Sequence, residues 1–434
     1  MQRSLSGFEK AFCLSEPLVP INFAVVARFT GGPDEAALRL ALRRLGERYP
    51  MAALRLDRDQ HGDPCFTTVG VPDFPLRVIE RTHAGAWQQI AAQELGSNFD
   101  LASGPLVRAV LLKQSTGAEL ILTFHHGIAD GMSAVYFLYD LLALLNDPQA
   151  DLPTLADQPD LFSLIPARAR RSLSLQMQVL GMKGGLWLVQ HLPSLKQRLP
   201  AADRLIEGCP PWEHFSLTTR SLTQAQTGCL AAICREQGTS VHAAICAAWL
   251  RARLETSPDI RNWKRVISCP VNLRGRLNMG NIFGLYMSNA IVAADCRPGR
   301  EFWAIAREIK TRIDQDIRTG RVYRWLLTMT GLMDSSPDAM RRAVPTFIAQ
   351  PVNYDFSITN LGRLSMPAQN GSLKLEAVYG PVVNTSEQEV TLGVSTVCDR
   401  LTMTLTYRDF VLDPVKAEKM ASRAVDLLAR ATGW

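Results

Sequence analysis

The chain has 434 residues, of which 47% are hydrophobic and 20% charged, with 29 glycines and 25 prolines. This composition excludes a disordered, collagenous or coiled-coil protein, because the chain can bury a large apolar core and shows no fibrous repeat. The net charge of +6 is concentrated in residues 161–342, which hold 26 basic and 13 acidic side chains. Such a region can attract phosphates, an acidic protein or an anionic membrane surface, whereas nucleic acid is disfavoured because no nucleic-acid-binding signature is present.

At roughly 150 residues per domain, a chain of this length predicts two or three domains, and we expect two. Residues 21–30 form a β-branched run that predicts a strand, and Asp34 marks the start of a helix with leucines at helical spacing. Further along, residues 105–112 and 118–124 predict a strand hairpin, and residues 132–145 predict an apolar helix. Strands and helices therefore interleave in this part of the chain.

A linker rich in proline and aspartate follows, and the next segment, residues 161–202, is both basic and apolar. It contains no acidic residue, and its six basic residues are Arg168, Arg170, Arg171, Lys183, Lys196 and Arg198. A buried helix would not need this charge, and a solvated linker would not need this much apolar surface. The pattern predicts a partly helical, amphipathic cover over a substrate channel or a membrane-facing patch, and an ordinary crossover packed on the second domain is the alternative.

A second series of strands and helices begins after two consecutive prolines at 210 and 211. Its predicted elements are a strand over 215–222, a helix over 240–254, a strand over 265–273, a long helix over about 300–318 and a strand over 352–359. We therefore expect an α/β protein with two mixed domains, residues 1–160 and 213–434, joined by a basic crossover over 161–212.

The nine cysteines are dispersed and form no C-x-x-C pair, which disfavours a disulfide framework and a zinc ribbon. Cys246 and Cys269 fall in apolar helix and strand runs, where we expect small buried residues, and His242 is expected to pack. The N-terminus has no long apolar segment, and no window has the ~18 apolar residues of a membrane span. The simplest expectation is a cytoplasmic location.

The strongest signal for chemistry is the sequence His125-His126-Gly127-Ile128-Ala129-Asp130-Gly131, here called the HH loop, between a predicted strand and a predicted helix. A strand end followed by a glycine-containing turn presents side chains at an edge where a cleft can form. A neutral imidazole there can accept a proton near pH 7. Asp130 could fix the loop by pairing with a base, and Gly131 permits close packing.

Simpler explanations exist for each of these residues. A lone histidine at a strand end is commonly structural, and Asp130 alone could be the N-cap of the following helix. Zinc binding by His125, His126 and Asp130 is disfavoured, because adjacent histidines point apart and no fourth ligand is evident. No Walker loop, dinucleotide fingerprint or G-x-S-x-G elbow is present, so ATP, NAD and a serine nucleophile are not implied.

The HH loop resembles the H-H-x-x-x-D-G motif of the condensation-like acyltransferases. This superfamily includes nonribosomal peptide condensation domains, polyketide-associated acyltransferases, alcohol acetyltransferases, wax ester synthases and plant BAHD enzymes. Further similarity lies in residues 34–56, 98–112, 268–277 and 281–289, so that it extends over nearly the whole chain. The resemblance implies two chloramphenicol-acetyltransferase-like domains arranged as a pseudo-dimeric V, with the active site at their interface.

The resemblance also implies roles for individual residues. His126 would be the catalytic base or a group that positions the transition state, and His125 would support the loop. Asp130 would be structural, with Gly131 beside it, and Arg274 would be its salt-bridge partner from the other domain. The alternative for Arg274 is an ordinary surface arginine.

Residues 354–362 occupy the place of the family's D-F-G-W-G segment but depart from it after Asp355 and Phe356. The departure argues against a plant-type BAHD enzyme and is closer to the bacterial acyltransferases. Polar and apolar residues alternate along this strand, so that one face is polar. Ser357 and Asn360 are candidates to hydrogen-bond the substrate or a developing oxyanion, and plain strand positions are the alternative.

The expected function is transfer of an acyl group from a thioester to an alcohol or amine, without a covalent acyl-enzyme, in natural-product or lipid biosynthesis. The donor would be acyl-coenzyme A or a phosphopantetheinyl carrier protein acting in trans on a monomer, and no bound cofactor or metal is expected. Peripheral membrane contact would involve residues 161–202. The alternatives are a non-catalytic module that recruits a carrier protein and a lipid-active enzyme of the wax ester synthase type.

Overall fold

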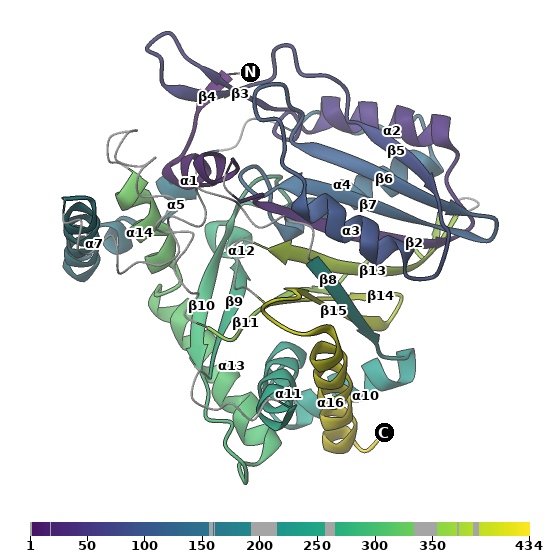
Figure 1. Cartoon of the computed structure of the whole chain (residues 1–434), viewed down its shortest axis with the longest axis vertical. Coiled ribbons are helices and arrows are strands. Elements are labelled where there is room, and N and C mark those ends of the chain that lie inside the picture. Colours follow the sequence, from purple (N-terminus) through teal and green to yellow (C-terminus); the bar gives the residue numbers. More distant parts are fainter. Residues whose placement is uncertain are drawn as a thin grey trace.

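The computed structural model describes residues 2–17, 19–155, 159, 161–191, 215–256, 265–333, 354–370, 373–384 and 390–434. Figure 1 shows two lobes, each built on a mixed β-sheet with helices packed against it. A third, small sheet of strand order β1-β4-β3 lies near the N-terminus. The expected mixed α/β architecture is therefore confirmed.

The N-terminal lobe has a six-stranded sheet of order β12-β13-β2-β7-β6-β5, in which only β5 and β6 pair in parallel. Helices α2 and α4 share a core with one face of the sheet, and α3 packs on the other face and against β8. The predicted hairpin is the antiparallel pair β6–β7, and the carboxylate of Asp34 caps α2 as predicted. The elements of this part are β1 (Gln2–Ser4), α1 (Gly7–Ser15), β2 (Asn22–Thr30), α2 (Glu35–Arg48), β3 (Arg55–Arg58), β4 (Pro64–Thr67), β5 (Leu76–Glu80), α3 (Ala86–Gly96), β6 (Val107–Gln114), β7 (Gly117–His125) and α4 (Gly131–Asn146).

The C-terminal lobe has a six-stranded sheet of order β10-β9-β11-β14-β15-β8. Helices α11, α13 and α16 share one apolar core with this sheet. The elements that follow residue 214 are β8 (Phe215–Ser221), α10 (Gln224–Glu236), α11 (Val241–Thr256), β9 (Val266–Asn272), α12 (Arg274–Leu277), β10 (Met287–Ala293), α13 (Phe302–Thr319), α14 (Tyr323–Met333), β11 (Phe356–Arg363), β12 (Gln369–Asn370), β13 (Leu373–Asn384), β14 (Thr391–Val397), β15 (Arg400–Arg408) and α16 (Pro414–Thr432).

Strand β13 departs from the predicted division of the chain. The prediction assigned every residue after 213 to a C-terminal domain, but β13 pairs antiparallel with β2 and so extends the N-terminal sheet. It also crosses β14 closely, because a Cβ atom on Gly393 would lie 2.2 Å from the carbonyl oxygen of Pro381. Boundaries near residues 160 and 213 stay a prediction, while the exchanged strand ties the two lobes together.

The middle segment is mostly helical over its described residues, 161–191, and the sequence predicted it to be partly helical. It contains α5 (Leu161–Leu164), α6 (Ala167–Arg170) and α7 (Leu173–His191), and α7 packs beside α14 at one edge of the molecule (Figure 1). The side chain of Val179 fits against Gly331, whereas Leu173, Met177 and Leu180 are 77%, 68% and 64% exposed. Lys196 and Arg198 lie outside the described residues.

Among the described residues, no helix combines the length and the apolar character that a transmembrane span requires.

Candidate active site

The HH loop lies where the sequence predicts it, at the junction of β7 and α4. Strand β7 is central in its sheet and buried along its whole length, and it ends at His125. The backbone N–H of His126 donates to the carbonyl oxygen of Ile21 at 2.7 Å, which continues the sheet one residue beyond the strand. The rigid strand therefore fixes where both histidine side chains begin.

The imidazole of His126 is buried, with 8% of the residue exposed. Its Nδ1 lies 2.9 Å from the carbonyl oxygen of Ala129, and because a carbonyl can only accept, Nδ1 carries the proton. The ring packs against Phe12 and Phe23, with centroids 5.5 and 4.9 Å away. Nε2 therefore keeps a lone pair, and burial lowers the pKa of His126, so that the ring is neutral and basic near pH 7.

His125 points to different partners. It is fully buried, its Nδ1 accepts the backbone N–H of Gly127 at 3.1 Å, and its Nε2 faces a carboxylate oxygen of Glu16 at 3.5 Å. The Glu16 carboxylate also accepts backbone N–H groups from Ile21 and Phe99, at 2.8 and 2.7 Å. These contacts support a structural role, in which His125 fastens the loop to the segment after α1.

Asp130 and Arg274 form the predicted ion pair, although the two residues are far apart in the sequence. The guanidinium binds both carboxylate oxygens, at 2.7 and 3.0 Å, and Arg274 is only 2% exposed. Burial opposes ionisation of Asp130, but the charge and hydrogen bonds of Arg274 outweigh it, and the pKa of Asp130 lies below its ordinary value. Arg274 is therefore not a surface arginine.

The carboxylate of Asp130 also accepts two backbone hydrogen bonds. It accepts the backbone N–H of Ser133 at 2.9 Å, so that it also caps α4, and it accepts the N–H of Tyr286 at 2.9 Å. The simple N-cap explanation and the ion-pair explanation are thus both correct. Because both oxygens are engaged in this way and the two histidine rings face other groups, the structure supports no zinc site at the HH loop.

Several residues that complete this network were not predicted from the sequence. The hydroxyl of Ser133 contacts Asp130, Arg274 and the backbone of Gly284 at 3.0, 2.9 and 2.7 Å. Ser133 follows Asp130 by three residues, a spacing typical of a helix N-terminus that could have drawn attention to it. Nothing comparable in the sequence connects Gly284 or Glu16 to the HH loop.

Gly131 provides the close approach that the sequence predicts for it. A Cβ atom at this position would lie 2.9 Å from Leu361 Cδ2 and 3.2 Å from Pro381 Cγ, so that these two side chains would have to shift to admit a larger residue. Leu361 belongs to β11, the strand that carries Ser357 and Asn360. The HH loop and this strand are therefore neighbours.

The structure gives Ser357 and Asn360 different surroundings. Ser357 is buried, and its backbone lies between β9 and β14. The side-chain oxygen of Asn360 accepts the backbone N–H of Gly362 at 2.7 Å, which commits one end of the amide to a local turn. No hydrogen bond joins either residue to His126 in the described part of the chain, so their roles stay predictions.

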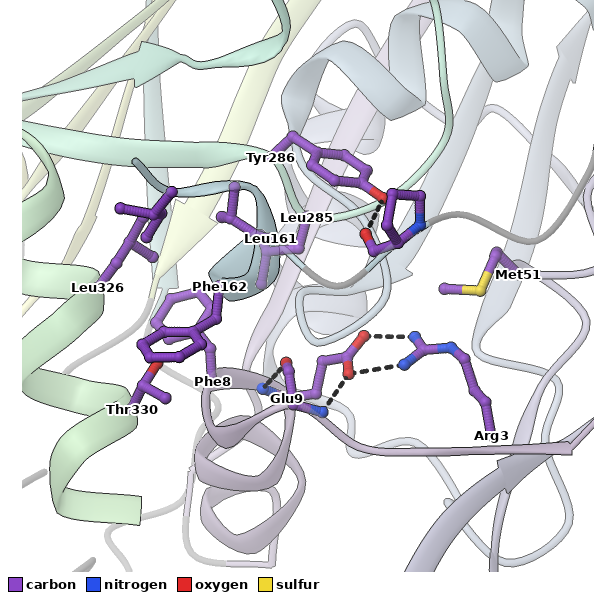
Figure 2. Close-up of a pocket in the computed structure, with 14 residues that line it drawn as sticks. Arg3, Phe8, Glu9, Met51, Leu161, Phe162, Leu285, Tyr286, Leu326 and Thr330 are labelled. Atoms are coloured by element: carbon purple, nitrogen blue, oxygen red, sulfur yellow. Dashed lines mark hydrogen bonds and ion pairs between the residues drawn. The ribbon is translucent and has the colours of Figure 1, made fainter. Parts of the chain in front are cut away.

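A pocket lies beside this network, between α1, α5 and α14 (Figure 2). It shares Gly284 and Tyr286 with the surroundings of Asp130, and it contains the Arg3–Glu9 ion pair. Its lining is otherwise largely apolar and consists of Ser6, Phe8, Met51, Pro159, Leu161, Phe162, Ile165, Leu285, Leu326 and Thr330. His126 does not line it, although Phe8 and Phe12, on the same helix, connect the pocket to the imidazole.

The sequence and the structure are similar to those of characterised proteins. Residues 212–406 match the family model described as the phthiocerol/phthiodiolone dimycocerosyl transferase C-terminus. A plipastatin synthase polypeptide of Bacillus subtilis (strain 168) is 25% identical over 296 residues, which cover 67% of this chain and 11% of that protein. The chain spans about a tenth or less of the length of the curated relatives it matches first.

Two solved structures show the same fold along almost the whole chain. The first condensation domain of the calcium-dependent antibiotic synthetase, in complex with a substrate analogue, matches with a TM-score of 0.68 at 17% identity and covers 100% of this chain and 96% of that one. The trichothecene 15-O-acetyltransferase from Fusarium sporotrichioides matches with a TM-score of 0.68 at 13% identity, covering 99% and 95%.

The fold is thus the two-lobed, chloramphenicol-acetyltransferase-like fold, and it presents the HH loop at the contact between the lobes. Residues 212–406 are thus similar to a transferase family, and the chain as a whole has the fold of the condensation domain and of the acetyltransferase, in agreement with the resemblance stated from the sequence.

Proposed function

We propose that this chain transfers an acyl group from a thioester to an alcohol or amine, with Nε2 of His126 as the proton acceptor. In this step the acceptor oxygen or nitrogen attacks the thioester carbonyl carbon while Nε2 takes its proton. Collapse of the tetrahedral intermediate breaks the carbon–sulfur bond, and the thiolate leaves with the proton from the imidazolium. No covalent acyl-enzyme forms, and the imidazole ends in its starting state.

One observation carries this proposal: the hydrogen bond from Nδ1 of His126 to the carbonyl oxygen of Ala129. It assigns the proton to Nδ1 and leaves Nε2 as a base, and burial of the ring holds it in the neutral form. Base assistance of this kind contributes ~10²- to 10⁴-fold, and holding the reactants together supplies much of the remaining catalysis. A module used only for docking has no need of a base prepared in this way.

The proposed donor is a carrier-bound or coenzyme A thioester, and the acceptor is an alcohol or an amine. A phosphopantetheinyl carrier protein suits the similarity to plipastatin synthase and to the condensation domain of the calcium-dependent antibiotic synthetase. Either an acidic carrier or the phosphates of coenzyme A suits the excess of basic residues over 161–342. We assign Ser357 and Asn360 to substrate contacts, since their strand lies against Gly131 of the HH loop. Ester and amide products are both compatible with this chemistry.

A lipid-like acceptor or donor is a second candidate, favoured by one observation. Three large apolar side chains of α7, Leu173, Met177 and Leu180, are exposed beside a cluster of arginines. Such a surface suits an enzyme that takes its substrate from a membrane or a lipid aggregate.

The test is a thioester-consumption assay with a panel of acyl-coenzyme A and acyl-carrier donors, each with alcohol, amine and long-chain alcohol acceptors. We expect release of the free thiol to depend on the acceptor and to yield an ester or amide in equal amount. Binding of a carrier protein without thiol release on any donor and acceptor pair would instead indicate a docking module. Thiol release without an acceptor would indicate a hydrolase.

A further inference from the structure

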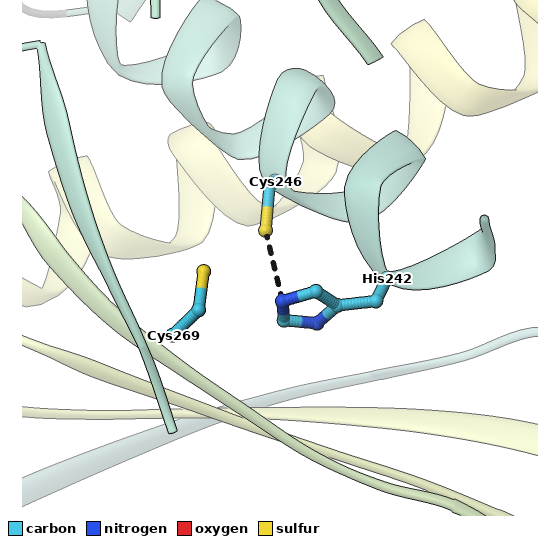
Figure 3. A group of neighbouring side chains, drawn as sticks. All are labelled: His242, Cys246 and Cys269. Atoms are coloured by element: carbon cyan, nitrogen blue, oxygen red, sulfur yellow. Dashed lines mark hydrogen bonds between the residues drawn. The ribbon is translucent and has the colours of Figure 1, made fainter. Parts of the chain in front are cut away.

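A compact group of soft ligands lies inside the C-terminal lobe, apart from the HH loop. His242 and Cys246 are one helical turn apart on α11, and Cys269 lies opposite them on β9 (Figure 3). One ligand atom from each residue lies within 4.8 Å of the other two. From the sequence these residues were expected only to pack, but the fold brings all three side chains to one point.

The separations fit a shared metal ion. An ion held tetrahedrally at about 2.3 Å from sulfur and about 2.0 Å from nitrogen keeps its ligand atoms about 3.5 to 3.8 Å apart. Nε2 of His242 and Sγ of Cys246 are 3.6 Å apart, so the helix already presents two ligands at the required spacing. The remaining separations, those from Sγ of Cys269, are at most 4.8 Å.

The three ligands differ in exposure. Cys246 and Cys269 are 0% and 1% exposed, whereas His242 is partly exposed and so marks the side from which an ion can enter. Because zinc binds the thiolate form of cysteine, binding of the ion would release protons from the thiols.

We propose that His242, Cys246 and Cys269 bind one zinc-type divalent cation between α11 and β9. Thiolate and imidazole ligands select zinc over calcium or magnesium, and three protein ligands leave a fourth position for water or an added thiol. The bound ion fastens the helix to the sheet and stabilises the C-terminal lobe. It takes no part in the acyl transfer at the HH loop.

The surroundings of Nδ1 of His242 set the expected affinity of the site for the ion. A ligating histidine ordinarily donates its second ring N–H to an oxygen, and loss of that partner weakens metal binding by on the order of 10- to 100-fold. Nδ1 of His242 is buried and has no hydrogen-bond partner in the described part of the chain. The site should therefore exchange its ion and be emptied by a chelator without unfolding of the protein.

The experiment titrates Co²⁺ into the full chain, freed of any affinity tag, stripped with a chelator and kept reduced with a phosphine. We expect thiolate-to-cobalt charge-transfer absorption that saturates at one ion per chain and is displaced by Zn²⁺. Zinc should raise the midpoint of thermal unfolding by a few degrees, because it binds only the folded state. His242→Ala should weaken binding by ~10-fold or more.

Two comparisons make the result decisive. Cys246→Ser and Cys269→Ser should each abolish the charge-transfer absorption, whereas Cys234→Ala, which removes another buried thiol, should leave it unchanged. His242→Ala keeps the test valid if a cysteine variant fails to fold, because His242 is partly exposed. Absence of the absorption in the wild type, equal binding by His242→Ala, or a protein mass that shows Cys246 joined to Cys269 in a disulfide would overturn the proposal.

Discussion

A single carbonyl oxygen determines how His126 can act. The Ala129 carbonyl accepts a hydrogen bond from Nδ1, the rings of Phe12 and Phe23 pack against the imidazole, and Nε2 is left without a proton and free to act as the proposed base. Only three residues separate His126 from Asp130, so the backbone turns back and places the Ala129 carbonyl against the imidazole. The chemistry of the site is therefore built from neighbours of His126 in the sequence, while its support comes from elsewhere in the chain.

The pH dependence of the reaction follows from the burial of His126. Because burial lowers the pKa of this group from 6.5, the neutral form should predominate down to pH values below 6.5. We expect kcat/KM for thioester consumption to stay constant from neutral pH down to about this value and to fall only at lower pH, as the imidazole takes up a proton. A midpoint of this acid limb above 6.5 would contradict the assigned environment.

His125 should affect stability more than chemistry. His125→Ala removes a buried ring, leaves the Gly127 N–H without its acceptor and opens space beside Glu16, so the free energy of unfolding should fall by about 1 to 3 kcal/mol. Urea unfolding and turnover per folded molecule measure the two effects separately. His61→Ala, at an exposed histidine, is the matched control and should change neither. A normal unfolding free energy with lost turnover would assign His125 to the chemistry.

At the scale of elements, local sequence patterns predicted individual helices, a cap and a hairpin, but they did not predict which distant strands pair. The Asp34 cap, the β6–β7 hairpin and helices α4, α11 and α13 follow from residues close together in the chain. Helix α1 carries an equally local signal, the capping box of Ser6 and Glu9, although no helix was predicted there. The exchange of β13 into the N-terminal sheet could not be predicted, because strand pairing depends on contacts between distant residues.

The link between α4 and α12 can be tested by a double-mutant cycle. Asp130→Ala or Arg274→Ala alone should lower the free energy of unfolding by about 3 to 5 kcal/mol, since each leaves a buried charge unpaired. The double variant should cost clearly less than the sum, and turnover should show the same non-additivity. Chemical unfolding and steady-state rates give both cycles.

The exposed pair Arg220–Glu418 provides the control for that cycle. Its side chains are 25% and 55% exposed, so its coupling should be about 0 to 1 kcal/mol. Additive effects for Asp130 and Arg274, similar to those of this exposed pair, would show that the ion pair does not hold the loop.

Helix α7 and the arginines that precede it should form a basic surface that binds anionic lipid. Replacing Arg168, Arg170 and Arg171 with Glu should weaken binding to vesicles that contain anionic lipid, more at low salt than at high salt, because exposed charges are screened by salt. Vesicle co-sedimentation at two ionic strengths measures this change. If the partner of this surface is instead an acidic carrier protein, the same variant should bind that protein more weakly while its binding to vesicles stays unchanged.

A matched variant carries the same charge change at exposed arginines elsewhere, Arg235→Glu, Arg318→Glu and Arg430→Glu. It should bind vesicles more strongly than the α7 variant does. Unchanged binding of the α7 variant at both ionic strengths, with activity retained on long-chain donors, would leave α7 only its packing against α14.

At the scale of the whole molecule, the site needs both halves of the chain. Asp130 is held by Arg274 and Tyr286, and Gly131 is covered by residues of β11 and β13. Helix α1 adds a third connection, because Phe8 packs edge-on against Trp325 of α14 at 4.8 Å between centroids while Phe12 contacts His126. The motif itself could be recognised in the sequence, but this enclosure depends on how the lobes meet.

The central claim is that Nε2 of His126 is the base for acyl transfer, and one measurement tests it most directly. Turnover of His126→Ala is compared with wild type and with His61→Ala on the best donor and acceptor pair, with circular dichroism as the check on folding. We predict a loss of at least ~10²-fold for His126→Ala and none for His61→Ala, with the fold retained in both. Near-normal turnover of a folded His126→Ala protein would contradict the account.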